Sequence, residues 1–315
     1  MRRKITVIGA GNVGATIAYT LSLGDIASEI VLIDINKEKV EGEVMDIVQG
    51  TSFREPISVI AGDYKDAADS SVVIITSGIG RKPGQSRIDL AQINVNILKE
   101  ITPQIVSVAP NALYIIVSNP VDVLTYVFLK HTGLPQERVI GSGTVLDTAR
   151  LRSRISQYYS VNQKNVHAYV LGEHGDSSFV PWSLVHIANN HIDTYKDHSP
   201  DCDKIQWNKD YAEIEEFVKK SGAQIIENKG ATFYAVAMSV CHICKCIYSD
   251  AGTALSVSTM MHGEYGVDDV CLSTLVLVDR SGVRGKILNT LTDEEMGKLR
   301  ASADKLKSVI AQIQL

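Results

Sequence analysis

The fold of this chain is decided by the run Ile5-Thr6-Val7-Ile8-Gly9-Ala10-Gly11-Asn12-Val13-Gly14. Its first four residues predict a strand, and a helical pattern continues from Val13 to Leu23. The glycines have the spacing G-x-G-x-x-G, which permits a tight turn and lets the backbone approach a pyrophosphate. Glycine triplets also form ordinary turns, but here a strand precedes them and a helix follows. We therefore expect a dinucleotide to contact Gly9, Gly11, Val13 and Gly14.

A carboxylate ends the next predicted strand, at Asp34. In dinucleotide folds, a carboxylate at this point accepts hydrogen bonds from the adenosine ribose hydroxyls. It also repels the 2′-phosphate of NADP, and neither Ile35 nor Asn36 supplies an arginine to offset that repulsion. The lysines that follow belong to a predicted helix face. The sequence therefore favours NAD over NADP.

Strand and helix signals alternate through the first half of the chain. Predicted strands cover Ile5–Gly9, Ile30–Asp34, Ile57–Ala61, Val72–Thr76, Tyr114–Ser118 and Val139–Ser142. Predicted helices between them include Asn36–Val48 and Ile88–Val108. Apolar strands separated by helices indicate a parallel sheet covered on both faces, and six strands in two sets of three are typical of the doubly wound Rossmann-type α/β fold.

The pattern changes after about Gly143. Strands are expected at Tyr169–Leu171 and Leu275–Val278, and helices at Tyr211–Asn228 and Thr292–Ile313. We expect two domains: a dinucleotide-binding Rossmann domain over residues 1–143, and an α+β domain for substrate binding and catalysis over residues 144–315.

Composition excludes several classes of partner. The 315 residues carry a formal net charge of -5, without a dense Lys/Arg block, so a nucleic-acid partner is not expected. No run approaches the roughly eighteen apolar residues that a membrane helix needs. The basic start Met1–Lys4 is followed by an apolar run too short for a signal peptide, because glycines interrupt it. We expect a soluble protein of the cytoplasm.

Three of the five cysteines cluster at Cys241, Cys244 and Cys246. A zinc site of this type needs a second ligand pair at a recognisable spacing, and Cys202 and Cys271 stand alone. The cluster falls in the apolar helical stretch Thr232–Tyr248. We interpret the cysteines as small buried core residues and expect no metal.

Two segments, residues 145–152 and 167–176, combine the groups needed to interconvert a 2-hydroxy acid and a 2-oxo acid. His174 lies between glycines after a predicted strand, and an imidazole titrates close to neutral pH, so it suits the proton transfer. Asp147 could orient it. Arg150, three residues further along a helix, could grip a carboxylate, and Arg87 lies in a Gly/Pro-rich loop that resembles a lid.

Spacing alone leaves other interpretations open. A lone histidine is more often a surface or core residue, and Asp-x-x-Arg on a helix is often only an ion pair. His167 and His174 do not have the spacing of a zinc protease. A non-catalytic dinucleotide-binding protein would also keep the fold, although such a protein should have lost part of this set of residues.

From end to end, the sequence resembles the L-lactate/malate dehydrogenase family. The segments that carry the resemblance are Gly9–Gly14, Asp34, Ser118–Asp122, Gly141–Thr144, Leu146–Arg152, Gly172–Asp176 and Lys229–Thr232. The resemblance implies that His174 and Asp147 form the proton relay and that Arg150 binds the substrate carboxylate. It also implies that Arg87 polarises the substrate carbonyl.

The same resemblance assigns further contacts. Asn119 would hydrogen-bond both substrate and cofactor, and Ser142 would lie near the cofactor carboxamide. Thr232 fits a lactate-type pocket. The remaining cofactor contacts that the resemblance implies are Lys39, Tyr64, Gly78 and Ser118. NAD would bind first, then the substrate, and the lid would close last to exclude water.

Within the family, Ser142–Arg152 and Glu173 favour the lactate enzymes. Arg81 does not, because the lactate enzymes usually carry glutamine at this lid position and the malate enzymes carry arginine. Arginine can pair the second carboxylate of oxaloacetate, whereas pyruvate offers it only a methyl group. We therefore expect an L-lactate dehydrogenase, with malate or broad 2-hydroxyacid specificity as the alternative.

Arg152 and His167 match the pair with which bacterial lactate enzymes bind fructose 1,6-bisphosphate at a subunit interface. Two cations that face a symmetry-related pair would suit phosphates, although both residues could equally be ordinary surface charges. The resemblance further implies a homotetramer or a dimer.

Overall fold

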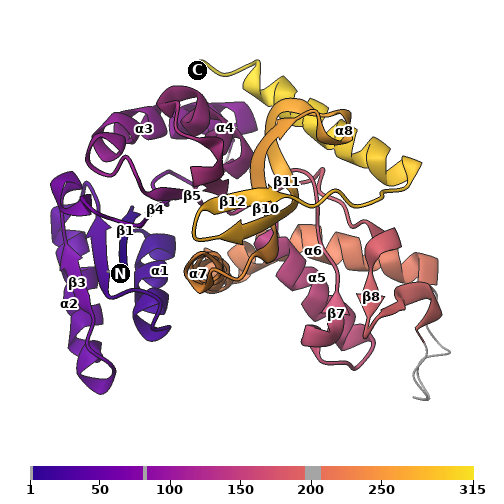
Figure 1. The fold of residues 1–315 in the computed structure, drawn as a ribbon, viewed down its shortest axis with the longest axis horizontal. Coiled ribbons are helices and arrows are strands. Elements are labelled where there is room, and N and C mark those ends of the chain that lie inside the picture. The colour runs from indigo at the N-terminus through magenta and orange to yellow at the C-terminus, as the bar shows by residue number, and fades with distance from the viewer. Residues whose placement is uncertain (1–2, 81–83, 196–206) are drawn as a thin grey trace.

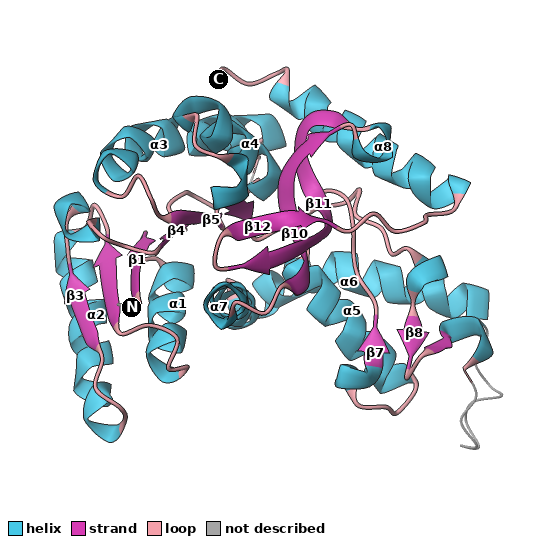
Figure 2. Cartoon of the chain, in the orientation of Figure 1, coloured by secondary structure: helices cyan, strands magenta, loops and turns pink. Residues whose placement is uncertain are grey.

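The computed structural model describes residues 3–80, 84–195 and 207–315 (Figures 1 and 2). The elements of the first half are β1 (Lys4–Ile8), α1 (Asn12–Leu23), β2 (Glu29–Ile33), α2 (Lys37–Gly50), β3 (Ser58–Ala61), β4 (Val72–Ile75), α3 (Arg87–Val108), β5 (Leu113–Ile116), α4 (Val121–Thr132) and β6 (Val139–Gly141). Those of the second half are α5 (Val145–Tyr158), β7 (Val166–His167), β8 (His186–Ile187), β9 (Asn190–His191), α6 (Trp207–Lys229), α7 (Tyr234–Ser249), β10 (Thr253–His262), β11 (Asp268–Asp279), β12 (Gly282–Lys286) and α8 (Asp293–Ile310).

The first six strands form the predicted doubly wound sheet. They are parallel and lie in the order β3-β2-β1-β4-β5-β6, so the chain reverses its direction of winding between β1 and β4. Ligands of such sheets bind outside the carboxyl ends of the strands near this reversal. The expected Rossmann-type α/β fold is confirmed.

Side chains that alternate along the strands pack against different helices on the two faces of the sheet. Ile5 and Val7 of β1 belong to one core with α1, α2 and α7, whereas Ile8 belongs to the opposite core with α3, α4 and α8. Successive side chains of a strand point to opposite faces, and both faces are apolar here because helices bury both. A third core joins α5 and α6 to the small β7–β9 sheet.

The sheet does not end with the first half of the chain. β10, β11 and β12 extend it in antiparallel fashion into nine strands, and the only residue pair that joins β10 to β6 in the described chain is Ser258 with Gly141. A Cβ at Gly141 would lie 2.8 Å from the Ser258 Cβ, so the junction requires glycine. Continuity of the sheet across the middle of the chain was not predicted.

One predicted strand is wrong. Tyr169–Leu171 forms no strand, and only Leu171 takes part in an isolated bridge, to Phe179. This bridge does not continue as a ladder, because the next residue, Gly172, has a φ of 92° and pairs with Ser273 of β11 instead. The other predicted strands and helices are present, with small shifts at their ends, and Leu275–Val278 lies within the longer β11.

Candidate active site

The predicted cofactor residues follow the carboxyl ends of neighbouring parallel strands. Gly9 follows β1, Asp34 follows β2, Gly78 comes after β4, Ser118 after β5 and Ser142 after β6. Because these strands are parallel, their ends meet at one edge of the sheet, and the structure brings the five positions together there.

The glycine loop packs closely against its neighbours and leaves space at the start of α1. Gly9 has a φ of 105°, and a Cβ on Gly14 would lie 1.8 Å from the Gly9 carbonyl oxygen, so α1 packs on β1 only with glycine at both positions. A Cβ on Gly11 would meet nothing within 4 Å. No side chain caps the start of α1, where Val13 lies. Open space beside uncapped N–H groups suits a pyrophosphate.

Asp34 ties this loop to the end of β2. One carboxylate oxygen accepts a hydrogen bond from Ala10 N at 2.5 Å, and the other accepts from Asn36 N at 2.9 Å. The pKa of Tyr64 is raised by burial and then by the charge of Asp34, which places the phenol near this carboxylate. Lys39 is exposed in the first turn of α2.

A buried amide, Asn94 of α3, holds two of the predicted cofactor loops together. Its Nδ2 donates to the carbonyls of Ile79 at 3.1 Å and Asn119 at 2.7 Å, and its Oδ1 accepts from Ile79 N at 2.8 Å. It thereby links the segment after Gly78 to the Asn119–Pro120 turn, which contains a cis peptide bond. Asn94 was not predicted, since nothing in a helical pattern distinguishes it from an ordinary polar residue.

Two serines complete this edge. The Ser118 hydroxyl donates to the Ser77 carbonyl at 2.6 Å and is buried, so its role in the structure is to join the ends of β5 and β4. Ser142 is half-buried, and its N–H donates to the Ile116 carbonyl at 2.8 Å.

His174 and Asp147 form a hydrogen-bonded pair although 27 positions separate them. Nδ1 of His174 lies 2.6 Å from Oδ2 of Asp147, which sits in the first turn of α5. The Asp147 side chain is only 9% exposed and the imidazole 25%. The Asp147 charge raises the pKa of His174 to about 9 against the opposing effect of burial. Burial raises the pKa of Asp147, but His174 and Arg150 outweigh it and the pKa is lowered.

Arg150 approaches the same carboxylate from one turn further along α5. Its Nη1 donates to Oδ1 of Asp147 at 3.0 Å, so Asp147 is shared between a histidine and an arginine. Gly222 of α6 packs beside the guanidinium, where a Cβ would lie 3.6 Å from Nη2. Asp147 and Arg150 therefore do form an ion pair, which was the alternative interpretation of the Asp-x-x-Arg spacing, and it lies next to His174.

Arg87 reaches the same loop from the other half of the chain. It is the first residue of α3, after the Ser86 cap, and its guanidinium forms an ion pair with Asp176, two residues beyond His174. The Arg87 hydrogen bond lowers the pKa of Asp176. Both side chains are more than half exposed, so the pair lies at the mouth of the site.

The loop that carries His174 is fixed from behind by main-chain and side-chain contacts. Gly172 forms a β-bridge with Ser273 of β11. The Glu173 carboxylate forms an ion pair with Lys305 of α8, with 3.2 Å between Oε2 and Nζ. The His174 N–H donates to Oδ2 of Asp122 at 2.8 Å. Asp122 lies in one of the motifs quoted above, but sequence reasoning gave it no role.

Four predicted positions lie apart from this cluster or outside the described residues. Thr232 is half-buried between α6 and α7. Arg152 donates from Nε to the Ala168 carbonyl at 3.0 Å, next to the exposed His167, so these two lie close together on α5 and β7. Arg81, the lid position that distinguished the two expected substrates, falls in residues 81–83, outside the described residues.

The cysteine cluster lies on α7, in the core. Cys241, Cys244 and Cys246 are buried, and burial raises the pKa of the Cys241 thiol to about 12. Cys271 is buried in β11, and Cys202 lies outside the described residues. Among residues 3–80, 84–195 and 207–315, no group of three His, Cys, Asp or Glu side chains could hold a metal ion. No helix in that part of the chain could span a membrane.

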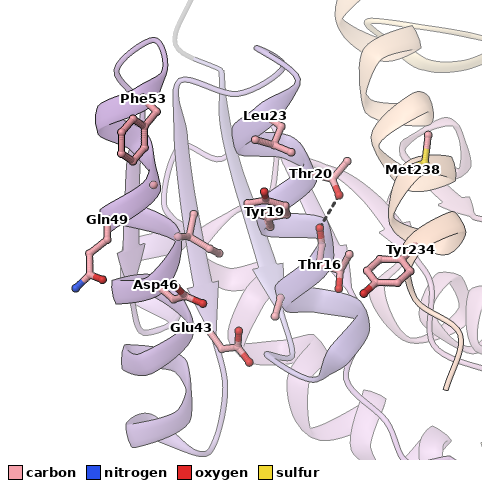
Figure 3. Close-up of a pocket in the computed structure, with 13 residues that line it drawn as sticks. Thr16, Tyr19, Thr20, Leu23, Glu43, Asp46, Gln49, Phe53, Tyr234 and Met238 are labelled. Carbon is pink, nitrogen blue, oxygen red and sulfur yellow. Dashed lines mark hydrogen bonds between the residues drawn. The ribbon is translucent and has the colours of Figure 1, made fainter. Parts of the chain in front are cut away.

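A groove lies elsewhere, between α1, α2 and α7 (Figure 3). It encloses about 840 Å³, and none of the residues predicted for the active site lines it. Figure 3 shows Tyr19 and Leu23 of α1 facing it, with Phe53 on one side and Tyr234 and Met238 on the other. Phe53, Tyr234 and Met238 are strongly exposed.

Comparison with known proteins identifies the family. Residues 3–141 match the lactate/malate dehydrogenase NAD binding domain, and residues 144–314 match the alpha/beta C-terminal domain of the same family. The chain is 45% identical to an L-lactate dehydrogenase of Clostridium perfringens and 47% identical to one of Acetivibrio thermocellus, in each case over 99% of this chain and 98% of the relative.

Solved structures agree. A lactate dehydrogenase enzyme from a Medee basin deep-sea metagenome library superposes with a TM-score of 0.94 at 39% identity, covering 99% of this chain and 98% of the other. The minor L-lactate dehydrogenase of Enterococcus mundtii gives 0.94 at 37% identity, covering 100% and 99%. The family resemblance and the NAD-binding domain expected from the sequence are confirmed. The chain belongs to the lactate/malate dehydrogenase family of NAD-dependent oxidoreductases.

Proposed function

We propose that this chain is an L-lactate dehydrogenase that interconverts (S)-lactate and pyruvate in the cytoplasm, with His174 as the acid and base. The observation that carries the proposal is the 2.6 Å contact between His174 and the buried Asp147, with Arg150 on the same carboxylate. The relatives named L-lactate dehydrogenase support the choice of substrate.

His174 moves the proton. Asp147 accepts from Nδ1, so Nε2 is the nitrogen that delivers a proton to the carbonyl oxygen of pyruvate or takes one from the hydroxyl of lactate. Because Asp147 raises the pKa of His174 to about 9, the imidazole is protonated at neutral pH and ready for reduction. Asp147 also stabilises the charged imidazole while the substrate binds.

Two arginines bind and polarise the substrate. One N–H of Arg150 is used by Asp147, and the guanidinium fork has further donors for a carboxylate. Arg87 lies at the mouth of the site and would reach the carbonyl oxygen after leaving Asp176. Asn119 and Thr232 complete the proposed substrate contacts, together with Arg81.

The edge of the sheet holds the cofactor. The glycine loop with Val13 would bind the pyrophosphate of NAD, Asp34 the ribose hydroxyls, and Lys39 and Tyr64 the adenosine side. The nicotinamide half would contact Gly78, Ser118, Asn119 and Ser142. When bound, NAD supplies the hydride acceptor for lactate, and NADH supplies the hydride for pyruvate.

Substrate choice is tested by an assay of NADH oxidation with pyruvate and with oxaloacetate. We expect a higher kcat/KM for pyruvate than for oxaloacetate. Arg81→Gln should widen that preference by about tenfold, because it removes a cation that can pair with the second carboxylate of oxaloacetate, where pyruvate has only a methyl group. If the parent prefers oxaloacetate and Arg81→Gln reverses that preference, the malate alternative is correct. Absence of turnover with any 2-oxo acid would favour a non-catalytic protein.

We further propose that the chain forms a homotetramer, or a dimer, and binds fructose 1,6-bisphosphate. The exposed apolar groove between α1, α2 and α7 supports association, since such surfaces usually mark interfaces. The proximity of Arg152 and His167 supports a phosphate site.

Fructose 1,6-bisphosphate should lower the apparent KM for pyruvate and shift sedimentation towards the tetramer, because the ligand would bridge cations of two subunits. Steady-state kinetics and analytical ultracentrifugation, each with and without the effector, measure both effects. Arg152→Gln should lose the response. No change in KM up to millimolar effector would contradict the proposed site.

A further inference from the structure

Asp122 is a buried carboxylate directly behind His174. It lies in the first turn of α4 and is 2% exposed. Its Oδ2 accepts from the His174 main-chain N–H at 2.8 Å. Its Oδ1 has no hydrogen bond of standard geometry among the described residues, although the Ser258 hydroxyl lies close enough to lower the pKa of Asp122. No arginine or lysine in that part of the chain forms an ion pair with Asp122. An ionised carboxylate so placed needs compensation from nearby positive charge.

The positive charge that faces Asp122 is that of His174 itself. The start of α4 adds the favourable end of a helix dipole, and Ser258 of β10 lies nearby. The pKa of Asp122 is raised to about 6: burial and, more weakly, the Glu173 charge raise it, and they outweigh Ser258, the His174 amide and the His174 charge, which lower it. At neutral pH Asp122 is therefore mainly ionised, and its charge acts on His174 in addition to that of Asp147.

The other charged and titratable groups around the pair are accounted for. Arg150 shares Asp147, and Asp176 is paired with Arg87. Glu173 is paired with Lys305, and burial raises the pKa of the Cys271 thiol well above its ordinary value, so that thiol is neutral. When the imidazole of His174 is protonated, the positive charges of His174 and Arg150 therefore equal the negative charges of Asp122 and Asp147.

Resting on the function proposed above, we propose that Asp122 is a positioning residue that fixes the His174 main chain and keeps the imidazole in its proton-donating form. Reduction of the 2-oxo acid moves one proton from Nε2 of His174 to the new hydroxyl, while the hydride comes from NADH. Without the charge of Asp122, a protonated His174 would leave the cluster one charge positive. Asp122 therefore favours the form that starts the reduction.

Asp122→Asn tests this inference, because the amide oxygen can still accept from the His174 N–H while the charge is lost. We expect the pH at which kcat/KM for pyruvate falls to move lower by about one unit. The pH at which kcat/KM for lactate rises should move lower by the same amount, since one group controls both directions. A purely structural role would lower both rates at every pH and leave the break where it is.

Asp279→Asn is the matched control. Asp279 is also a buried carboxylate, but it lies at the far end of β11 and bonds Ser281. Loss of the Asp279 charge should leave the pH of the break in each direction within about 0.2 pH units of its value in the unmodified protein. If Asp122→Asn also leaves them unmoved, or moves them in opposite directions, the inference is wrong.

A second variant and a second measurement keep the inference testable if Asp122→Asn does not fold. Asp122→Ala loses both the charge and the acceptor, so it should show the same downward shift together with a lower kcat. Titration of the His174 C2 proton by NMR measures the imidazole without turnover. A lower midpoint in either variant supports the inference even if the substrate is not pyruvate, and an unchanged midpoint overturns it.

Discussion

Replacing His174 with asparagine should lower kcat for pyruvate reduction about 10³–10⁴-fold while NADH still binds. Asparagine keeps the main-chain hydrogen bond to Asp122 but offers no group that can donate a proton at neutral pH. The cofactor contacts proposed here belong to the edge of the parallel sheet and do not involve the imidazole. The expected result is a nearly inactive protein with an almost unchanged affinity for NADH.

Stopped-flow turnover and fluorescence titration with NADH measure the two quantities separately. The variant should also be less stable, by about 1–3 kcal/mol, because the buried Asp147 keeps only Arg150 as a partner. His131→Asn, on the exposed end of α4, is the matched control and should retain activity. A loss of activity below tenfold in His174→Asn would remove His174 from the chemistry.

Local patterns were sufficient to predict the parallel half of the fold. Strands β1, β2, β4, β5 and β6 are short apolar runs buried on both faces, whereas the edge strand β3 is buried only at Val59. The helices between them show the helical spacing of apolar residues. The glycine loop could also be predicted, because Gly9 and Gly14 meet a steric requirement that is local to the β1–α1 turn.

Contacts between distant segments could not be predicted in this way. The junction of β10 with β6 depends on Gly141 lying against Ser258, and neither residue carries a strand signal for that pairing. Tyr169–Leu171 has the composition of a strand, but the turn at Gly172 leaves it without a ladder. Composition describes what a segment can form, whereas pairing depends on which partner reaches it.

The site shows the same division. The pairing of His174 with Asp147 was a hypothesis from their chemistry that the family resemblance also implies, since no spacing rule joins residues 27 positions apart. Asn94 and Asp122 were missed because each is defined by what its buried polar group contacts: the Ile79 and Asn119 backbone in one case, the His174 amide in the other. Buried polar groups need partners, so the structure identifies them where the sequence does not.

The proposed reaction depends on whether His174 is protonated. Protonated His174 is needed to reduce pyruvate and neutral His174 to oxidise lactate. The charge of Asp147 raises the pKa of His174 to about 9, so the protonated form dominates below that pH and is lost above it. The two directions of the reaction should therefore respond to pH in opposite senses around the same value.

The most direct measurement is kcat/KM against pH for the unmodified protein, in both directions, at saturating cofactor. For pyruvate with NADH, we expect a plateau at neutral pH and a tenfold fall per unit above about pH 9. For lactate with NAD, we expect a tenfold rise per unit up to about pH 9 and a plateau beyond. Breaks at clearly different pH values in the two directions, or a profile for pyruvate that stays flat to pH 10.5 (about 1.5 units beyond the expected break), would contradict the assignment of His174 as the proton donor.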